Sequence, residues 1–588
     1  MFLASTAIEQ FWNKNEELLF LGRWCVRRLS PNELKQLRYT VLPNPWNDRR
    51  RLSEVESYLD RFSETALNQL SEYLNQTHGV HLDTRYWRVL VSPWLVHYLH
   101  VLYDRYTILS DAFAKYPDLQ TVVLDPECFY RPPDTGSFAK ASMEDPYNLQ
   151  LFSALLGAME HDFQTQPYHP IVTGAQPDRN TLRVRLKKAV LRAESVAKTI
   201  AIKRGDGVGM YSMYWKRPQQ WTLALHSGFK FFPFSLTTSP LARAGSHRDP
   251  QRRHAIGSLP ASSPFEKIFW RLAEDDFPEI YLEGYEYARE AVLSSNPRFP
   301  EAVLADSAWY FDEPFKFFAA EAHRSGKCLV AAQHGGGFGL TRYIPSELHE
   351  SRLADAYFVW GWADSQPKHH NLPSPCIGRD RRPSKNHSSI LFISTANPLY
   401  LCYRFHSTPL GDQWIDYFEW QLRFLKELST SYRRSTIYRP YPIENGFDIT
   451  AQVQEKFPEV RIDRGRLPHE LSRSRLVVID HSGTTFLQTL ASNIPTILYW
   501  DPQRWEIRDE AMPYMELLVK AGILWPTPED AARAVERVYD NVTDWWDGRE
   551  IQNARRTFCS RFALSSENWV QAWKKQLATC KMGFAIRN

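Results

Sequence analysis

The polar stretch from Asp480 to Thr485 carries the side chains best suited to chemistry in this sequence, because it combines a carboxylate, an imidazole, a glycine and three hydroxyls. It follows the apolar run 476–479 and precedes an amphipathic segment, 484–492, and a second apolar run, 496–500. This pattern predicts a strand, a loop, a helix and a strand. Such a loop lies at the carboxyl edge of a parallel sheet and begins a helix whose free N–H groups favour an anion. We therefore expect Ser482, Gly483, Thr484 and Thr485 to bind a phosphate, with Asp480 and His481 as further candidate binding residues of the same loop.

A histidine followed by glycines is the second candidate. His334 ends the apolar run 328–332, and the next residues are Gly335, Gly336 and Gly337. Glycines leave the backbone bare for a ligand, and an imidazole at a strand end can act as a general base or donate to a leaving phosphate oxygen. We expect His334 to be catalytic.

Acidic residues offer an alternative base. Glu279, Glu283 and Glu286 lie in the segment 277–290, which has a helical pattern. Acids of this kind are more often a solvated helix face, so Glu279 and Glu283 are the second choice after His334.

Arg439 ends the expected strand 436–438, where a guanidinium can bind a phosphate bidentately. Asn397 lies in the polar loop after the expected strand 390–393, and we also place it on the donor side. An alternative metal site, Asp125 with Glu127, has Pro126 between its acids, which favours a turn. We therefore expect no metal in the reaction.

The elements around these residues alternate between strand and helix patterns, which indicates parallel sheets. The polar segment 363–387 is the best candidate for a linker. The expected fold class is α/β, with two Rossmann-like domains facing a cleft and extra helices in the N-terminal domain. The expected domains are an N-terminal α/β domain with helical insertions, 1–375, a C-terminal α/β domain, 376–545, and C-terminal helices, 546–588, that pack back across both.

Expected elements of the N-terminal half include a strand at 18–21 and two helices. One helix would begin after Ser63 and end at Gly79, and the other would begin at Ser92 and Pro93.

Composition narrows the class of protein. The 588 residues are 43% hydrophobic and 23% charged, with a net charge of only +4, which does not indicate a nucleic-acid partner. The 7 cysteines are scattered without a CxxC pair, which favours a reducing, cytoplasmic compartment. No signal peptide or membrane span is evident. The basic amphipathic segment 182–200 suggests peripheral contact with the inner membrane surface, although a solvated outer helix is the commoner explanation.

Several motifs also carry a family resemblance: LFLGRWC, YWRVLVSPWLVHYLHVLYDRY, QHGGGFG, FVWGW, IYRPYP and DHSGTTFLQTLASNIPTILYW. Together they resemble a transferase family of bacterial O-antigen and surface-polysaccharide gene clusters, first grouped from spirochaetes. QHGG and the strand-Arg-Pro motif are more distantly similar to capsule and teichoic-acid polymerases and to Kdo or sialic-acid transferases of the GT-B type. Unlike the polymerases, this chain lacks a second histidine beside Arg439, which argues against a polyol-phosphate donor.

The resemblance implies a GT-B-like glycosyltransferase that uses a nucleotide-sugar as substrate, without a cofactor. The domain 376–545 would bind the nucleotide-sugar, and the domain 1–375 would be the acceptor side. The acceptor would be an O-antigen-type glycan or a lipid-linked glycan. Alternative functions are a sugar-nucleotide epimerase or polyol-phosphate transferase on the same fold, or a non-catalytic protein that binds a glycan or nucleotide.

Overall fold

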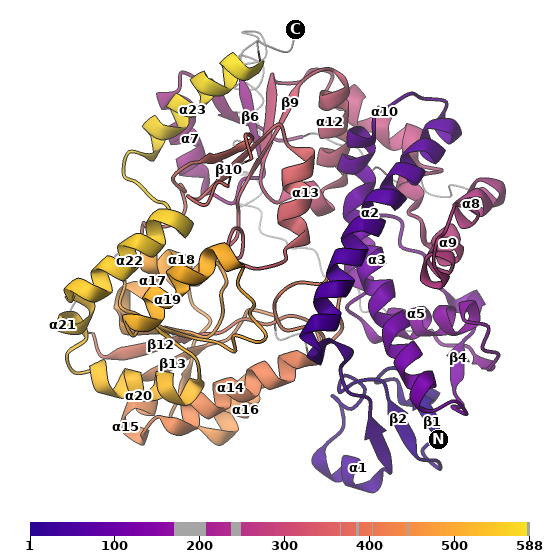
Figure 1. Ribbon diagram of the computed structural model, residues 1–588, viewed down its shortest axis with the longest axis horizontal. Helices are drawn as coiled ribbons and strands as arrows, with labels where there is room; N and C mark the ends of the chain where they lie inside the picture. The colour runs from indigo at the N-terminus through magenta and orange to yellow at the C-terminus, as the bar shows by residue number, and fades with distance from the viewer. Residues whose placement is uncertain are drawn as a thin grey trace, which may run out of the picture. The chain divides into compact units, whose positions relative to one another are not determined.

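The structure, a computed structural model, describes residues 1–169, 207–236, 241, 248–364, 366–380, 382–383, 387–402, 404–443 and 446–584. The chain divides into two compact units. Unit 1 comprises Met1–Ser212, Lys230–Leu329 and Tyr400–Phe405, and unit 2 comprises Met213–Phe229, Val330–Leu399 and His406–Asn588 (Figure 1). These bounds differ from the expected domains, because residues from Val330 onward group with the C-terminal half.

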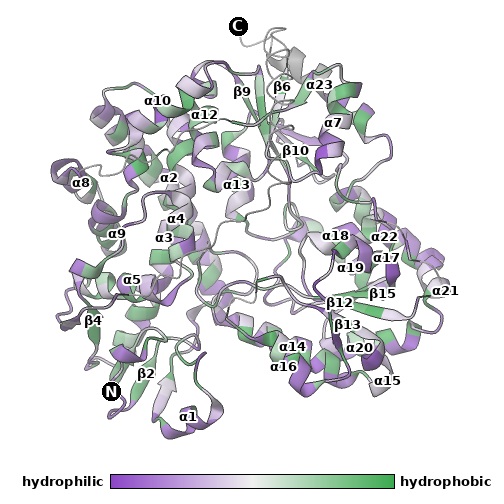
Figure 2. Ribbon diagram, turned by 180° about the vertical axis from the view of Figure 1, so that it is seen from behind, coloured by the Kyte–Doolittle hydropathy of each residue, from purple (hydrophilic) through white to green (hydrophobic). Residues whose placement is uncertain are grey.

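The α/β class with two large parallel sheets is confirmed. One six-stranded sheet has the order β11-β10-β9-β8-β6-β7 and the other β14-β13-β12-β15-β16-β17. Every strand pair whose register is known in them is parallel. Strands β6 and β9 are mostly buried and coloured mainly as hydrophobic in Figure 2, as expected for strands covered on both faces.

Unit 1 is built around two long helices, α2 (Arg49–His78) and α3 (Thr84–Lys115), which pack against each other. Asp48 and Asp83 accept hydrogen bonds from the first N–H groups of these helices. The predicted starts at Ser63 and Ser92 are therefore wrong, because an aspartate caps each helix further upstream and Pro93 lies inside α3. The predicted end at Gly79 is confirmed, where φ of 62° suits a glycine.

The remaining elements in the described part of unit 1 are shorter than α2 and α3. Three parallel strands, β1 (Phe2–Ala4), β2 (Leu18–Phe20) and β3 (Tyr39–Val41), form a sheet that includes the expected first strand. The other strands are β4 (Val122–Leu124), β5 (Gln164–Gln166), β6 (Val208–Tyr211), β7 (Phe231–Pro233) and β8 (Ala302–Ala305). The other helices are η1 (Glu9–Phe11), α1 (Pro31–Gln36), η2 (Pro45–Asn47), η3 (Pro126–Cys128), α4 (Thr135–Ala141), α5 (Asp145–Ala158), α8 (Pro250–Gly257), α9 (Pro264–Asp276), η4 (Glu279–Tyr281), α10 (Tyr285–Ser295), α11 (Ala308–Phe311) and α12 (Glu313–Arg324).

The sheet that lies wholly in unit 2 has a doubly wound topology. Its strands are β12 (Ser389–Ile393), β13 (Thr436–Arg439), β14 (Arg461–Ile462), β15 (Ser474–Ile479), β16 (Thr496–Tyr499) and β17 (Leu524–Trp525). If the strands are numbered one to six along the chain, their order across the sheet is 3-2-1-4-5-6. The direction of winding therefore reverses between β12 and β15. Open α/β sheets bind ligands at such a reversal, beyond the carboxyl ends of the strands.

Helices cover both faces of this sheet. In Figure 1, α14 (Gln413–Glu427), α16 (Ile449–Lys456) and α20 (Pro528–Val538) lie on one side, and α17 (Leu467–Arg473) and α18 (Thr484–Ala491) on the other. The remaining helices of unit 2 are α7 (Arg217–His226), α13 (Pro345–Leu353), α15 (Thr430–Ser435), η5 (Asp509–Ala511), α19 (Met512–Lys520), α21 (Val542–Asp547), α22 (Arg549–Phe562) and α23 (Trp569–Phe584). The predicted helical C-terminus is confirmed, and α22 packs on α18 and α19.

The predicted linker, 363–387, contains a strand. Strand β11 (His369–Asn371) pairs with β10 (Ala356–Val359), which in turn pairs with β9 (Cys328–Ala332). His369 is buried and its Nε2 lies 2.8 Å from Ser351 Oγ. A polar edge strand of this length has no apolar alternation, which is why the sequence did not indicate it.

Candidate functional site

The candidate site lies at the carboxyl edge of the unit 2 sheet. Ile393 at the end of β12 pairs with Ile479 of β15 on one side and with Arg439 of β13 on the other. The loops that follow these strands therefore start side by side, because neighbouring strands are only about 5 Å apart. They carry Asn397, which is half-buried, and the stretch from Asp480.

The stretch from Asp480 leads into the start of α18 as predicted. Gly483 is the N-cap residue, and no side chain caps the helix. Asp480 and Ser482 are buried, as is His481, whereas Thr484 and Thr485 are partly exposed. The first N–H groups of a helix that no side chain caps are available to an anion.

The histidine-glycine loop meets this helix start within unit 2. A Cβ atom on Gly336 would lie 2.4 Å from the carbonyl carbon of Gly483 and 2.6 Å from the backbone nitrogen of Thr484. Only a glycine allows two backbones to approach this closely. The two loops that the sequence singled out are therefore in direct contact.

Polar contacts hold the loop on both sides of Gly336. Gln333 donates to the carbonyl oxygen of Gly335 at 2.9 Å and accepts from Trp362 Nε1 at 2.7 Å. At the other end the N–H of Gly339 donates to Glu347 Oε2 at 2.6 Å, and Arg508 Nη2 lies 2.9 Å from the second oxygen of Glu347. Burial raises the pKa of Glu347, although Arg508 acts in the opposite direction.

His334 is paired with a carboxylate that sequence reasoning missed. Its Nε2 lies 2.9 Å from Glu350 Oε1, and Tyr357 donates its hydroxyl to Glu350 Oε2, also at 2.9 Å. The Glu350 side chain is 0% exposed and that of His334 is 20% exposed. A buried carboxylate that fixes one imidazole nitrogen orients the other, as in catalytic histidine pairs.

The remaining predicted residues have other partners. Arg439 Nη1 lies 3.3 Å from Asp463 Oδ2, and the arginine side chain is 15% exposed. Glu283 binds Arg253 at 2.8 Å, and Glu279 lies 3.7 Å from Arg248. Both glutamates belong to unit 1, and the expectation that they share one helix is wrong, because η4 ends at Tyr281 and α10 begins after Gly284.

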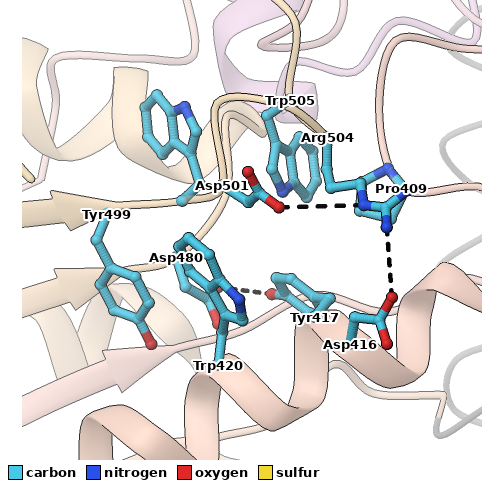
Figure 3. Close-up of a pocket in the computed structure, with 10 residues that line it drawn as sticks. Pro409, Asp416, Tyr417, Trp420, Asp480, Tyr499, Asp501, Arg504 and Trp505 are labelled. Atoms are coloured by element: carbon cyan, nitrogen blue, oxygen red, sulfur yellow. Dashed lines mark hydrogen bonds and ion pairs between the residues drawn. The ribbon is translucent and has the colours of Figure 1, made fainter. Parts of the chain in front are cut away.

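Asp480 takes part in a small aromatic network. Its Oδ1 accepts from the Tyr417 hydroxyl at 2.6 Å (Figure 3). The same oxygen lies 3.0 Å from His481 Nδ1. Tyr417, on α14, is a further residue that the sequence did not indicate. Burial, and then Asp480, raise the pKa of Tyr417 well above its ordinary value, so its hydroxyl keeps its proton.

Three other features bear on the predictions. Asp125 accepts from the N–H of Glu127 in the short turn η3, and the described residues contain no cluster of three or more His, Cys, Asp or Glu able to hold a metal ion. In the same part of the chain no helix is both long and apolar enough to cross a membrane. The basic segment 182–200 lies outside the described residues.

A family model matches residues 1–577, and its description is LIC12162 family transferase. The chain therefore belongs to this transferase family, which agrees with the resemblance of its motifs. No curated protein matches the sequence.

Solved structures give only weak superpositions. UDP-GlcNAc 2-epimerase from Neisseria meningitidis, bound to UDP-GlcNAc, has a TM-score of 0.37 and 12% identity, over 63% of this chain and 99% of that one. Acinetobacter baumannii MurG has a TM-score of 0.34 and 10% identity, over 64% and 99%. WaaG, a glycosyltransferase involved in lipopolysaccharide biosynthesis, has a TM-score of 0.32 and 11% identity, over 63% and 99%. Likeness of this degree carries no argument about the reaction.

Proposed function

We propose that this transferase is a glycosyltransferase that moves a sugar from a nucleotide-sugar to an O-antigen-type glycan or a lipid-linked glycan, without a metal ion. One observation carries the proposal: the loop that bears His334 touches the uncapped start of α18 through Gly336 and Gly483. A candidate base and a candidate phosphate site thus lie in one place, which is what transfer from a nucleotide-sugar requires.

In this proposal the start of α18, with Thr484 and Thr485, holds the phosphate, and Arg439 offsets the charge that grows on the leaving group. Arg439 would exchange its 3.3 Å contact with Asp463 for the phosphate. Each preorganised donor of this kind contributes roughly 10²- to 10³-fold to the rate. His334 would remove the acceptor proton, with its imidazole held in place by Glu350 at Nε2.

We place the reaction in the cytoplasm. The scattered cysteines suit a reducing compartment, and nucleotide-sugar donors would be available there. Peripheral contact with the inner membrane surface remains part of the proposal for a lipid-linked acceptor.

A thermal-shift screen of CMP, UDP, GDP and dTDP tests the donor class. A nucleotide at about 100 times its dissociation constant stabilises the fold by roughly 2.7 kcal/mol. We expect one of the four to raise the melting temperature, and R439A to reduce that shift. R434A, which changes an exposed arginine on α15, is the matched control and should leave the shift unchanged. No stabilisation by any of the four, or equal shifts in R439A and wild type, would contradict the donor site.

Assays of sugar-nucleotide conversion, with and without acceptor, distinguish the glycosyltransferase from an epimerase and from a non-catalytic binding protein. Release of an epimerised sugar-nucleotide without acceptor would favour an epimerase. Binding without any conversion in the presence of a cell-derived acceptor would favour a non-catalytic protein.

A further inference from the structure

A pocket in unit 2 lies between α14 and the carboxyl ends of β15 and β16 (Figure 3). Half of the residues that line it are aromatic: Tyr417, Trp420, Tyr499, Trp500 and Trp505. Aromatic faces of this kind accept the C–H faces of sugar rings as well as other apolar surfaces. The wall alone therefore does not identify a ligand.

Two buried polar atoms of this pocket lack a hydrogen-bond partner among the described residues. They are Asp480 Oδ2 and the hydroxyl of Tyr499. Asp480 is 2% exposed and Tyr499 is 0% exposed. Leaving such a group unpaired costs about 1–3 kcal/mol. A polar ligand group that enters the pocket and pairs with both atoms would remove this cost.

The first oxygen of Asp480 is already occupied, which leaves Oδ2 as an acceptor for a ligand. Oδ1 receives the Tyr417 hydroxyl at 2.6 Å. Burial, and then Asp480, raise the pKa of Tyr499 well above its ordinary value, so this hydroxyl is protonated at neutral pH and can donate as well as accept.

Charge excludes a phosphate from this pocket. Asp416, Asp480 and Asp501 line it together with a single cation, Arg504. Arg504 lies 3.4 Å from Asp416 and 4.0 Å from Asp501, so its charge is shared between two of the carboxylates. Size is equally restrictive: the cavity holds about 20 Å³, which is room for about one water-sized group such as a hydroxyl.

We propose that this pocket is a subsite for an uncharged sugar ring, which lies against the indole rings and inserts a hydroxyl or hydroxymethyl group toward Asp480 Oδ2 and the Tyr499 hydroxyl. The inference deepens the proposed function and rests on it, since the ring belongs either to the nucleotide's ribose or to a sugar of the donor or acceptor. Phosphate binding is assigned to the start of α18, and hydroxyl recognition to this pocket.

Binding of uncharged ligands to the full chain tests the proposal without any contribution from phosphate. The probes are uridine, cytidine, guanosine and thymidine in one arm, and glucose, galactose and N-acetylglucosamine in the other, followed by ligand-observed NMR titration. We expect one arm to bind, which identifies the source of the ring. Y499F should weaken that binding about 3- to 10-fold, the loss of one hydrogen bond. Failure of both arms to bind overturns the proposal.

Tyr514→Phe is the matched control, because this tyrosine lies in the same unit, packs on Phe562 and does not line the pocket. It should bind as the wild type does. Y499F should also keep or raise the melting temperature, because it removes a buried hydroxyl without a partner. Equal affinity of Y499F and wild type for every probe would overturn the subsite.

The nucleotide screen distinguishes this failure from failure of the transferase. If Y499F leaves both sugar binding and the nucleotide shift unchanged, the subsite is refuted and the donor site stands. If no nucleotide binds but an uncharged sugar does, with the expected loss in Y499F, the donor site is refuted and the pocket stands as a sugar site.

Discussion

At the residue scale, the proposed proton transfer depends on the pairing of His334 with Glu350. Glu350 is fully buried and holds one imidazole nitrogen, while the histidine itself reaches the surface. A carboxylate in this position fixes the ring and stabilises the imidazolium that forms when a proton is taken. In the proposed function Glu350 would therefore act through His334, as a positioning residue.

Replacing Glu350 by glutamine tests this role. E350Q keeps the shape of the side chain but removes its charge, so we expect kcat to fall at least about 10-fold while nucleotide affinity stays close to the wild-type value. Steady-state kinetics and nucleotide titration measure the two effects separately.

Tyr357→Phe is the control for E350Q. It removes the other hydrogen bond of Glu350, at 2.9 Å, and leaves His334 paired. It should lower stability by about 1.5–3 kcal/mol with little change in kcat. Parallel losses of kcat in the two variants would show that Glu350 matters only for packing.

Sequence reasoning reached His334 but not Glu350, and the reason is physical. The three glycines after His334 are a local signal, whereas Glu350 lies 16 positions further on, in a helix with no motif of its own. The structure also shows that Gly336 is required for packing against Gly483, so the glycine signal has a structural component.

At the element scale, the contact between the histidine-glycine loop and α18 is the feature that assembles the site. Gly336→Ala would place a methyl group 2.4 Å from the carbonyl carbon of Gly483. Backbone atoms cannot yield as a flexible side chain does, so we expect a loss of about 1–3 kcal/mol in stability together with a loss of nucleotide binding. Chemical denaturation and titration measure both.

Gly157→Ala is the control, because a Cβ on this helical glycine of α5 meets nothing within 4 Å. It should be neutral or slightly stabilising. A G336A protein with normal stability and normal nucleotide affinity would show that the contact is not needed.

The elements differ in how well the sequence predicts them. The sequence predicts the unit β15-α18-β16 to within a few residues, because its apolar runs and polar loop are local signals. It does not predict the starts of α2 and α3, because serines inside these helices resemble N-cap residues as closely as the aspartates that do cap them. Strand β11 owes its extended conformation to pairing with β10. The polar sequence of β11 alone carries no signal of that pairing.

At the scale of the whole molecule, a buried histidine in unit 1 links stability to pH. His97 lies in α3, is 0% exposed and contacts the carbonyl oxygen of Cys402 through Nε2. Burial, and then Arg404, lower the pKa of His97 to about 3, from an ordinary value of 6.5. The contact involves the segment Tyr400–Phe405, which belongs to unit 1 although the residues on both sides of it belong to unit 2.

The sign of the effect follows from proton uptake. Between pH 6.5 and about 3 the unfolded chain binds a proton at this position and the folded chain does not, so stability falls as the pH falls, by about 1.4 kcal/mol per pH unit. His97→Gln keeps a donor for Cys402 and removes the titration. Urea unfolding at about pH 7 and about pH 5 should show an acid loss larger by about 2 kcal/mol in wild type than in H97Q. Identical losses would show that His97 does not remain neutral in the folded protein.

The central claim is that His334 and the start of α18 form one transferase site, and a single comparison tests it most directly. For the nucleotide that stabilises the protein, the dissociation constant and the rate of nucleotide release from its sugar conjugate, with acceptor present, are measured in wild type and H334A. We expect the dissociation constant to change less than about 3-fold and the rate to fall about 10²- to 10⁴-fold. Wild-type turnover by H334A, or equal loss of binding and turnover, would contradict the assignment of His334 as the catalytic base beside a separate phosphate site.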